Sequence, residues 1–387
     1  MRYALIATAM LATACSDGPE PFELGSQFPP NNGPSIRLTY NVNDDRAPTW
    51  AAASDSLYFS AESYPPFAPT SGLLLAAPRE GGVVSVLFPQ GALAQPAYVA
   101  PAVSEAADDI AFFEVTRLWR YDCALVVHST LPESKPDTAA MLPLLQQAVL
   151  HVRPLDRAAA DAATLLVDFG GRHLDTSRTP FGLPGVTVIE GALFQREYGY
   201  DRSPLFRTSW APDGQRVVFS NGRQLMIWTV GSPAATAIPN TDDAVWPAWS
   251  PDGQWIAFSR LTHGRREQHE FYCLSQAGNV IDVYDVTIYN SAPNAPGLPQ
   301  LELIRPDGTD GSLLGVGEAP AWSPDGSQIV FARNGALWRS NHDGTNATQI
   351  ADTDGAREPA VSPDGSWVAF TRLHPANNKR DVWVAPY

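Results

Sequence analysis

The sequence predicts an all-β fold of six repeated four-stranded units, and three observations lead to it. A template of about fourteen residues recurs six times, a second hairpin follows it in several units, and the composition is rich in turn residues. The template is clearest in PAWSPDGQWIAFSR (247–260) and PAWSPDGSQIVFAR (320–333). Such repetition indicates a modular architecture, because a catalytic motif is normally needed once.

Each copy of the template predicts a β-hairpin. In the two clearest copies, with Trp249 and Trp322 as position 0, Pro stands at −2, Ser-Pro-Asp-Gly at +1 to +4 and Phe at +9. All six copies keep the Phe, and five keep the Pro. Pro at −2 is expected at the first residue of a strand, where its missing N–H leaves no ladder bond unmade. Pro-Asp-Gly favours a tight turn, and the alternation that follows, with Ile256 and Phe258 on one face, is typical of a strand. The six anchors at position 0 are Trp50, Val103, Trp210, Trp249, Trp322 and Val361.

A second hairpin completes the repeating unit. Turn pairs separate two apolar runs in 73–88 (Gly81-Gly82), 301–314 (Asp307-Gly308) and 337–350 (Asp343-Gly344). Four antiparallel strands in about forty residues match one propeller blade, so the sequence predicts a six-bladed β-propeller, with seven blades as the alternative. The last unit ends in its third strand at 381–387, and we expect 35–41 to supply the fourth and close the ring.

Composition supports a single turn-rich domain and excludes two kinds of partner. The 387 residues are 44% hydrophobic and include 35 Pro and 29 Gly. The formal net charge of −15 argues against nucleic acid and against anionic membrane surfaces as partners. We expect a monomeric propeller over residues 35–387.

The Trp-Ser-Pro-Asp-Gly hairpins resemble the TolB-like β-propeller repeats, which also occur in the propellers of prolyl-oligopeptidase-type peptidases. The resemblance covers about residues 35–387 and is strongest from residue 203 onward. TolB carries an additional N-terminal α/β domain for which this chain has no room, so the resemblance is to the propeller part. It implies a fold and leaves the function open, because such propellers serve many tasks.

The N-terminus, MRYALIATAMLATACSDG, resembles a bacterial lipoprotein signal. Residues 1–14 have an early Arg2, an apolar run and small residues before Cys15, which would become the lipidated first residue. Ser16 resembles the type sorted to the outer membrane, and residues 15–34 are expected to be a flexible tether. The expected location is therefore the bacterial cell envelope, lipid-anchored and facing the periplasm. Ala12, where a lipobox usually has Leu, leaves open ordinary cleavage that would release a soluble periplasmic or secreted protein.

No catalytic, cofactor or metal motif is found in the sequence. It has no G-x-S-x-G elbow, P-loop, Rossmann fingerprint, HExxH or paired CxxC. In HGRREQHE (263–270), His263, His269 and Glu270 are spaced poorly for a metal, and a polar solvated loop is expected instead. DGTDG (307–311) is expected to be a strand-connecting turn and not a calcium loop. The sequence thus predicts no catalytic residue, no cofactor and no metal.

Three long insertions are predicted on one face of the propeller, over units two to four. They lie at about 116–146 and 262–299, between the second and third strands, and at about 170–203, between units two and three. Loop elaboration on one face of a rigid scaffold is expected of a binding surface, while neutral drift in tolerant loops is the alternative. Cys123 and Cys273 lie in two of these insertions and could form a disulfide, the alternative being two buried thiols.

Residues three and four places before each anchor are expected around the central channel, with two aspartates slightly farther out. A mixed ring of charges with one aromatic suits a peptide or a small polar ligand, unless the charges pair with one another. The candidate binding residues are Asp45, Arg46, Arg207, Asp243, Trp246, Glu318, Arg357 and Glu358.

Two function classes remain from the sequence. The first is a non-catalytic cell-envelope lipoprotein that binds an envelope protein, a peptide or a glycan through the elaborated face. The alternative is an enzyme at the channel mouth, a polysaccharide lyase or a hydrolase, because related propellers include polysaccharide lyases. An enzyme should show clustered His and carboxylates in the channel, and the candidate ring has no His.

Overall fold

The computed structural model describes residues 34–387 with thirteen gaps, so the leader, Cys15 and most of the tether lie outside the described residues. The gaps are 41–42, 64–70, 89–96, 120–124, 129–143, 157–162, 170–171, 176–185, 196–205, 261–265, 275–279, 291–298 and 375–378. Every regular element in the described ranges is a β-strand, which confirms the all-β prediction. A search of these ranges finds no helix with the length and apolar character to span a bilayer.

The described strands form six four-stranded antiparallel groups, which we call units 1 to 6. Unit 1 is β2 (Asp44–Trp50), β3 (Ser56–Ser63), β4 (Ser71–Pro78) and β5 (Ser85–Val86). Unit 2 is β6 (Ala97–Val103), β7 (Asp109–Trp119), β9 (Leu144–Pro154) and β10 (Ala163–Asp168). Unit 3 is β13 (Thr208–Trp210), β14 (Arg216–Ser220), β15 (Leu225–Thr229) and β16 (Thr236–Ala237).

The remaining three units follow the same order. Unit 4 is β17 (Ala244–Trp249), β18 (Ile256–Arg260), β21 (Gln300–Ile304) and β22 (Ser312–Val316). Unit 5 is β23 (Glu318–Trp322), β24 (Gln328–Arg333), β25 (Ala336–Asn341) and β26 (Thr348–Gln349). Unit 6 is β27 (Ala356–Val361), β28 (Trp367–His374), β29 (Lys379–Pro386) and β1 (Ile36–Arg37), which pairs with β29 through Ile36 and Val384.

The template proline lies inside the first strand, so the prediction that it begins the strand was wrong. In units 1, 2, 4, 5 and 6 the pairing register shifts at this point, which marks a β-bulge. The residue before each proline has a positive φ of 50–54°, as in Ala47, Trp246 and Glu358. A bulge removes the need for a ladder hydrogen bond from the proline nitrogen, so proline is tolerated there.

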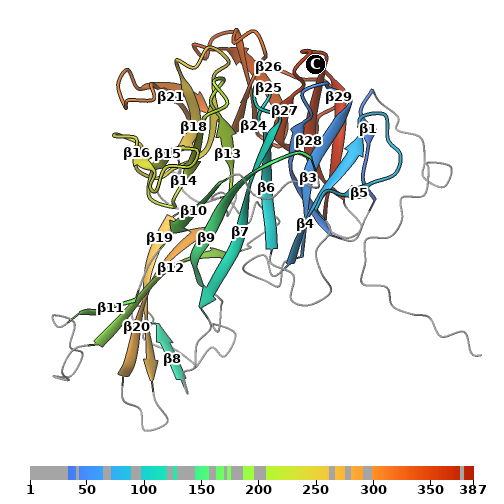
Figure 1. Ribbon diagram of the computed structural model, residues 1–387. Helices are drawn as coiled ribbons and strands as arrows, with labels where there is room; N and C mark the ends of the chain where they lie inside the picture. Colours follow the sequence, from blue (N-terminus) through green and yellow to red (C-terminus); the bar gives the residue numbers. More distant parts are fainter. Residues whose placement is uncertain are drawn as a thin grey trace, which may run out of the picture.

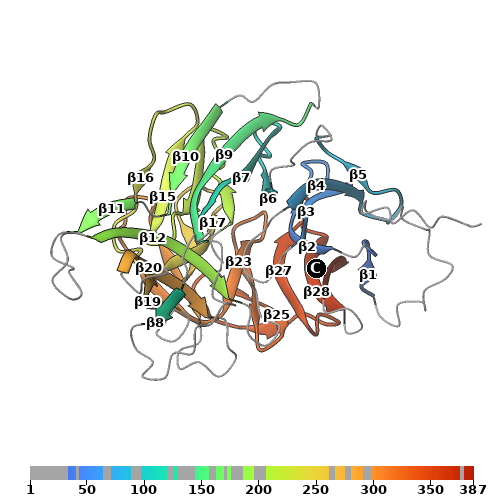
Figure 2. The ribbon, with the colours of Figure 1, turned by 90° about the horizontal axis from the view of Figure 1, so that it is seen from below.

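Apolar clusters between neighbouring units hold the units together. Phe219 and Trp210 of unit 3 pack with Phe113 of unit 2, and Phe59 of unit 1 packs with Val382 of unit 6. Equivalent clusters join units 1 and 2, 3 and 4, 4 and 5, and 5 and 6. In Figure 2 the first strands β2, β6, β17, β23 and β27 lie innermost, around a common centre.

Three anchor tryptophans also bridge units through their indole nitrogens. Nε1 of Trp50 donates to the carbonyl of Ala360 at 2.9 Å, which links unit 1 to unit 6. Trp210 donates to Ala102 at 2.9 Å, and Trp322 donates to Ala248 at 3.0 Å. Each of these three tryptophans therefore packs its ring between units and fixes the spacing to the preceding unit with one directional bond.

The three predicted insertions pair with one another into one sheet, which we call the insertion sheet. It contains β8 (Leu125–His128), β11 (Arg172–Asp175), β12 (Val186–Gln195), β19 (Arg266–Leu274) and β20 (Val280–Asn290), in the order β11-β12-β20-β19-β8. Strands β12 and β20 are parallel over nine residue pairs, and one pair, Ala192 with Leu145, connects the sheet to β9. Figure 1 shows these strands extending away from the six units.

Candidate functional site

Five of the eight predicted ring residues are buried, and the other three are partly exposed. Asp45 and Arg46 lie in β2, Trp246 in β17, Glu318 in β23 and Glu358 in β27. The four charged side chains among them are therefore removed from bulk water, and a buried ion needs a partner. The partly exposed residues are Arg207, Asp243 and Arg357.

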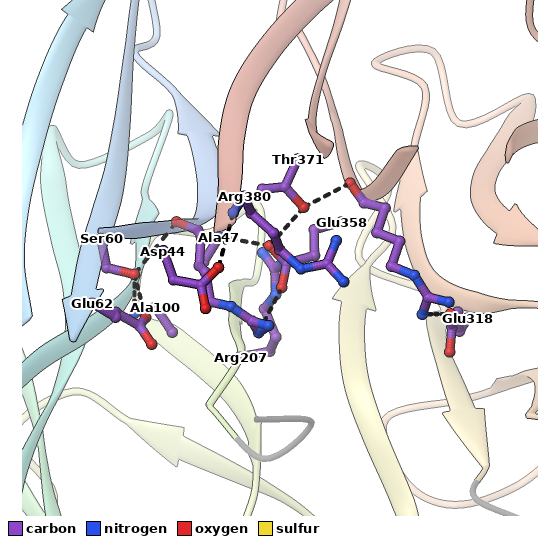
Figure 3. Close-up of polar contacts among 12 residues, drawn as sticks. Asp44, Ala47, Ser60, Glu62, Ala100, Arg207, Glu318, Glu358, Thr371 and Arg380 are labelled. Carbon is purple, nitrogen blue, oxygen red and sulfur yellow. Dashed lines mark hydrogen bonds and ion pairs between the residues drawn. The ribbon is translucent and has the colours of Figure 1, made fainter. Parts of the chain in front are cut away.

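Glu358 is the centre of a buried contact network between units 6, 1 and 3 (Figure 3). Its Oε2 accepts a hydrogen bond of 3.0 Å from the backbone N–H of Ala47, at the bulge of unit 1, and one of 3.3 Å from Thr371 Oγ1. Arg46 Nη1 lies 3.6 Å from Oε1, and Arg207 Nη2 lies 3.5 Å from Oε2. One carboxylate thus connects residues from three units.

The other ring charges also have partners. Arg357 and Glu318 form an ion pair between units 6 and 5. Asp45 is fully buried in β2, and Asp243 precedes β17 with a φ of 60°. Five of the ring residues therefore pair with one another, which is the alternative to ligand binding that the sequence left open. They are Arg46, Arg207, Glu318, Arg357 and Glu358. Their role in ligand binding stays a prediction.

The structure adds charged residues that the template did not indicate, at the seam between units 1 and 6. Asp44 Oδ1 accepts a hydrogen bond of 2.9 Å from the backbone N–H of Arg380 (Figure 3). Arg37 Nη2 lies 2.8 Å from Asp381 Oδ2. Burial raises the pKa of Asp381 to about 6, against the opposing effect of Arg37. These residues occupy ordinary strand positions, so no repeat signal could reveal them.

Glu62 in β3 is a further buried carboxyl in this region. Ser60 Oγ donates to its Oε1 at 2.5 Å, and the same hydroxyl oxygen accepts from the backbone N–H of Ala100 in unit 2 at 3.4 Å. Burial raises the pKa of Glu62 to about 8, and Glu358 and Asp44 raise it further, while Arg46 and Ser60 lower it. The Glu62 side chain is therefore largely protonated at neutral pH.

A cavity of about 480 Å³ opens along the central axis at the end of the units where their first hairpin turns lie. We call this the turn end, and the opposite end, from which the insertions extend, the insertion end. Of the predicted ring, Arg207 and Trp246 line this cavity. The sequence analysis predicted a binding surface at the insertion end, so a cavity at the turn end was not expected. Its walls include the five bulge prolines, Pro48, Pro101, Pro247, Pro320 and Pro359.

The segment HGRREQHE (263–270), expected to be a polar solvated loop, lies partly in a strand. His269 and Glu270 lie in β19, so the prediction of a solvated loop over these residues was wrong, and His263 lies outside the described residues. Pairing of β19 with β20 and β8 explains the difference, because the insertion sheet forms from segments distant in sequence. Within the described ranges, no three His, Cys, Asp or Glu residues are grouped as metal ligands.

The two cysteine-bearing insertions meet in the insertion sheet. Cys273 pairs with Val126, and β8 begins two residues after Cys123, which itself lies outside the described residues. The disulfide and the two buried thiols stay open as alternatives, and a disulfide would stabilise the fold by about 2–4 kcal/mol. Non-reducing peptide mapping decides between them: a disulfide should place both cysteines in one linked fragment. Two alkylatable thiols in the folded protein would rule the disulfide out.

No protein-family model and no curated protein matches the sequence. Among solved structures, the chain is similar to TolB from Acinetobacter baumannii, at 12% identity and a TM-score of 0.45, over 82% of this chain and 57% of that chain. A putative TolB from Agrobacterium tumefaciens gives 12% identity and a TM-score of 0.46, over 91% and 96%. An oligogalacturonate lyase from Vibrio parahaemolyticus gives 11% identity and a TM-score of 0.42, over 89% of this chain and 78% of that chain. The chain thus spans little more than half of the Acinetobacter TolB, and the solved structures similar to it include TolB propellers, whose repeats its hairpins resemble.

Proposed function

We propose that this chain is a non-catalytic scaffold of the bacterial cell envelope, which binds a protein, peptide or glycan through its insertion sheet. The observation that carries the proposal is the joining of three insertions, from three separate parts of the chain, into one sheet. Independent drift of the loops would not be expected to give nine residue pairs between β12 and β20. A shared sheet gives a rigid surface on which a partner can dock.

The scaffold beneath it is proposed to be a closed six-bladed propeller. Six four-stranded units, an apolar cluster between each pair of neighbours and the pairing of β1 with β29 support this architecture. The hydrogen bond from Trp50 to Ala360 adds a direct link between the first and last units. Pairing with β1 covers the edge that β29 would otherwise expose, which favours the monomeric state.

Replacing the unit-4 insertion tests the proposed binding surface. Arg260 and Gln300 are direct strand partners, as Arg333 and Ala336 are in unit 5, where Asn334-Gly335 alone connects them. Substituting Asn-Gly for residues 261–299 should therefore leave unit 4 intact while removing β19 and β20. We expect the variant to stay folded, with a cooperative thermal transition, and to lose the partners that crosslink to the full chain in envelope preparations. Unchanged crosslinking by the folded variant would contradict the proposal.

Anchoring is proposed to occur through lipid on Cys15, supported by the Arg-led apolar leader before it. Expression of the full chain in a diderm bacterium with a clickable fatty acid should label the protein and place it in the outer-membrane fraction. Cys15→Ser should abolish the label and release the chain. Label that persists in Cys15→Ser, or an unlabelled wild type, would overturn the assignment.

A further inference from the structure

The turn end carries much of the negative charge of the chain. The first hairpin turns of the six units span 51–56, 104–109, 211–216, 250–255, 323–328 and 362–367. They contain eight carboxylates and one arginine, a net charge of −7 out of −15 for the whole chain. The arginine, Arg216, is already paired with Asp213 at 2.8 Å. Four of these turns contribute residues to the lining of the 480 Å³ cavity, among them Pro212, Pro251 and Pro324.

Two of the turn carboxylates, those of Asp325 and Asp364, are held ionised by neutral donors. Asp325 Oδ1 accepts from Ser323 Oγ at 2.6 Å and from the backbone N–H of Ser327 at 3.0 Å. Asp364 makes the equivalent bonds with Ser362 and Ser366. The serine hydroxyls and the backbone bonds lower the pKa of both carboxyls. Because these donors carry no charge, the turns are stabilised while the face stays anionic.

The eight prolines of the cavity wall limit the number of its backbone hydrogen-bond donors. Its lining includes the five bulge prolines and the three turn prolines, and proline contributes a carbonyl and no N–H. Several donors of the wall are used internally. The backbone N–H of Trp249 donates to Ser209 Oγ at 2.9 Å, and that of Ala319 donates to Ser259 Oγ at 3.0 Å. Arg207, the one Lys or Arg among the described lining residues, pairs with Glu358.

We propose that the turn-end cavity binds an extended cationic segment of a partner protein. Lysine and arginine side chains offer several donors and no acceptor, which complements a wall with few backbone donors and the carboxylates of the turns. Their aliphatic stems can pack on the prolines and on the indole of Trp246. A segment with several cations matches these carboxylates better than a single small ion, because they are spread over six turns. This site lies at the end opposite the insertion sheet and does not depend on it.

Fluorescence anisotropy with labelled peptides tests the site on the purified full chain. We expect an alternating Lys-Ser peptide of about twelve residues to bind about tenfold more tightly than its Gln-Ser counterpart at low salt, and a Glu-Ser peptide not to bind. Binding should weaken with added salt. Spermine, which carries cations without a peptide backbone, is the competitor. Displacement by spermine at lower concentration than the unlabelled Lys-Ser peptide would overturn the assignment to a protein segment.

A matched pair of variants locates the site on the turn end. Asp252→Asn with Asp325→Asn removes two charges from the first hairpin turns of units 4 and 5, which we call the inner turns. The turns between the third and fourth strands are the outer turns. Asp307→Asn with Asp343→Asn removes two charges from the outer turns of the same units, where each carboxylate also accepts from the N–H two residues on. Asn preserves such turns. The inner variant should weaken Lys-Ser binding about tenfold and the outer variant less than about twofold.

The outcomes separate this inference from the proposed function. The chain with Asn-Gly in place of 261–299 should bind the Lys-Ser peptide with unchanged affinity, since its turn end is intact. Equal weakening by the inner and outer variants would show general attraction to an acidic protein and would overturn the site. Tight binding of the Glu-Ser peptide would also overturn it.

Discussion

Glu358→Ala should destabilise the fold by about 3–5 kcal/mol, because it leaves buried groups without their charge partner. The carboxylate lies within 3.6 Å of Arg46 Nη1 and 3.5 Å of Arg207 Nη2, and it accepts from the N–H of Ala47. A buried charge pair that loses one member costs more than the pair itself contributes. Alanine is compatible with the backbone here, because Ala47 adopts the same φ of 52° at the equivalent bulge of unit 1.

Urea unfolding of wild type and variant measures this loss. Glu80→Ala is the matched control, because Glu80 pairs with Arg79 at 3.2 Å while its side chain is 84% exposed. The control should change the free energy of unfolding by less than about 0.5 kcal/mol. A loss below about 1 kcal/mol for Glu358→Ala would mean that water, and not the protein, satisfies Arg46 and Arg207.

The repeat made most of the fold predictable from the sequence. Proline, Asp-Gly and the alternating apolar residues act locally, so the hairpins and the turns at Asp307-Gly308 and Asp343-Gly344 were confirmed. The position of the template proline was wrong because a bulge depends on the neighbouring strand. The residue before that proline is Ala, Trp or Glu, none of which signals a positive φ.

The candidate site was less predictable, because it depends on contacts between units. The sequence located Arg46, Arg207 and Glu358 near one another, but it could not show that they pair through a carboxylate shared among three units. Glu62 and Asp381 were missed because they occupy no repeated position of the template, and only packing in the folded protein buries them. The pairing of three insertions into one sheet likewise depends on segments more than ninety residues apart, such as β12 and β20.

Burial of Glu62 makes the stability of the fold depend on pH. Its pKa is about 8 in the folded protein and 4.5 in the absence of burial, so the folded state binds its proton more tightly than the unfolded chain. The stabilisation from this proton is fully present below pH 4.5 and is lost as the pH rises through about 8. A shift of this size corresponds to a change on the order of 4–5 kcal/mol across the window.

Glu62→Gln isolates that contribution, because glutamine keeps an oxygen to accept from Ser60 Oγ and carries no titrating proton. At pH 5 the variant and the wild type should unfold at similar urea concentrations. At pH 9 the variant should be more stable by a few kcal/mol, because the wild type must then hold an ionised carboxylate beside Glu358 and Asp44. Asp381, with a pKa of about 6, shifts stability in the same direction at lower pH, but it is present in both proteins and cancels in their difference. A difference between the two proteins that does not change from pH 5 to pH 9 would show that Glu62 is ionised and solvated in the folded protein.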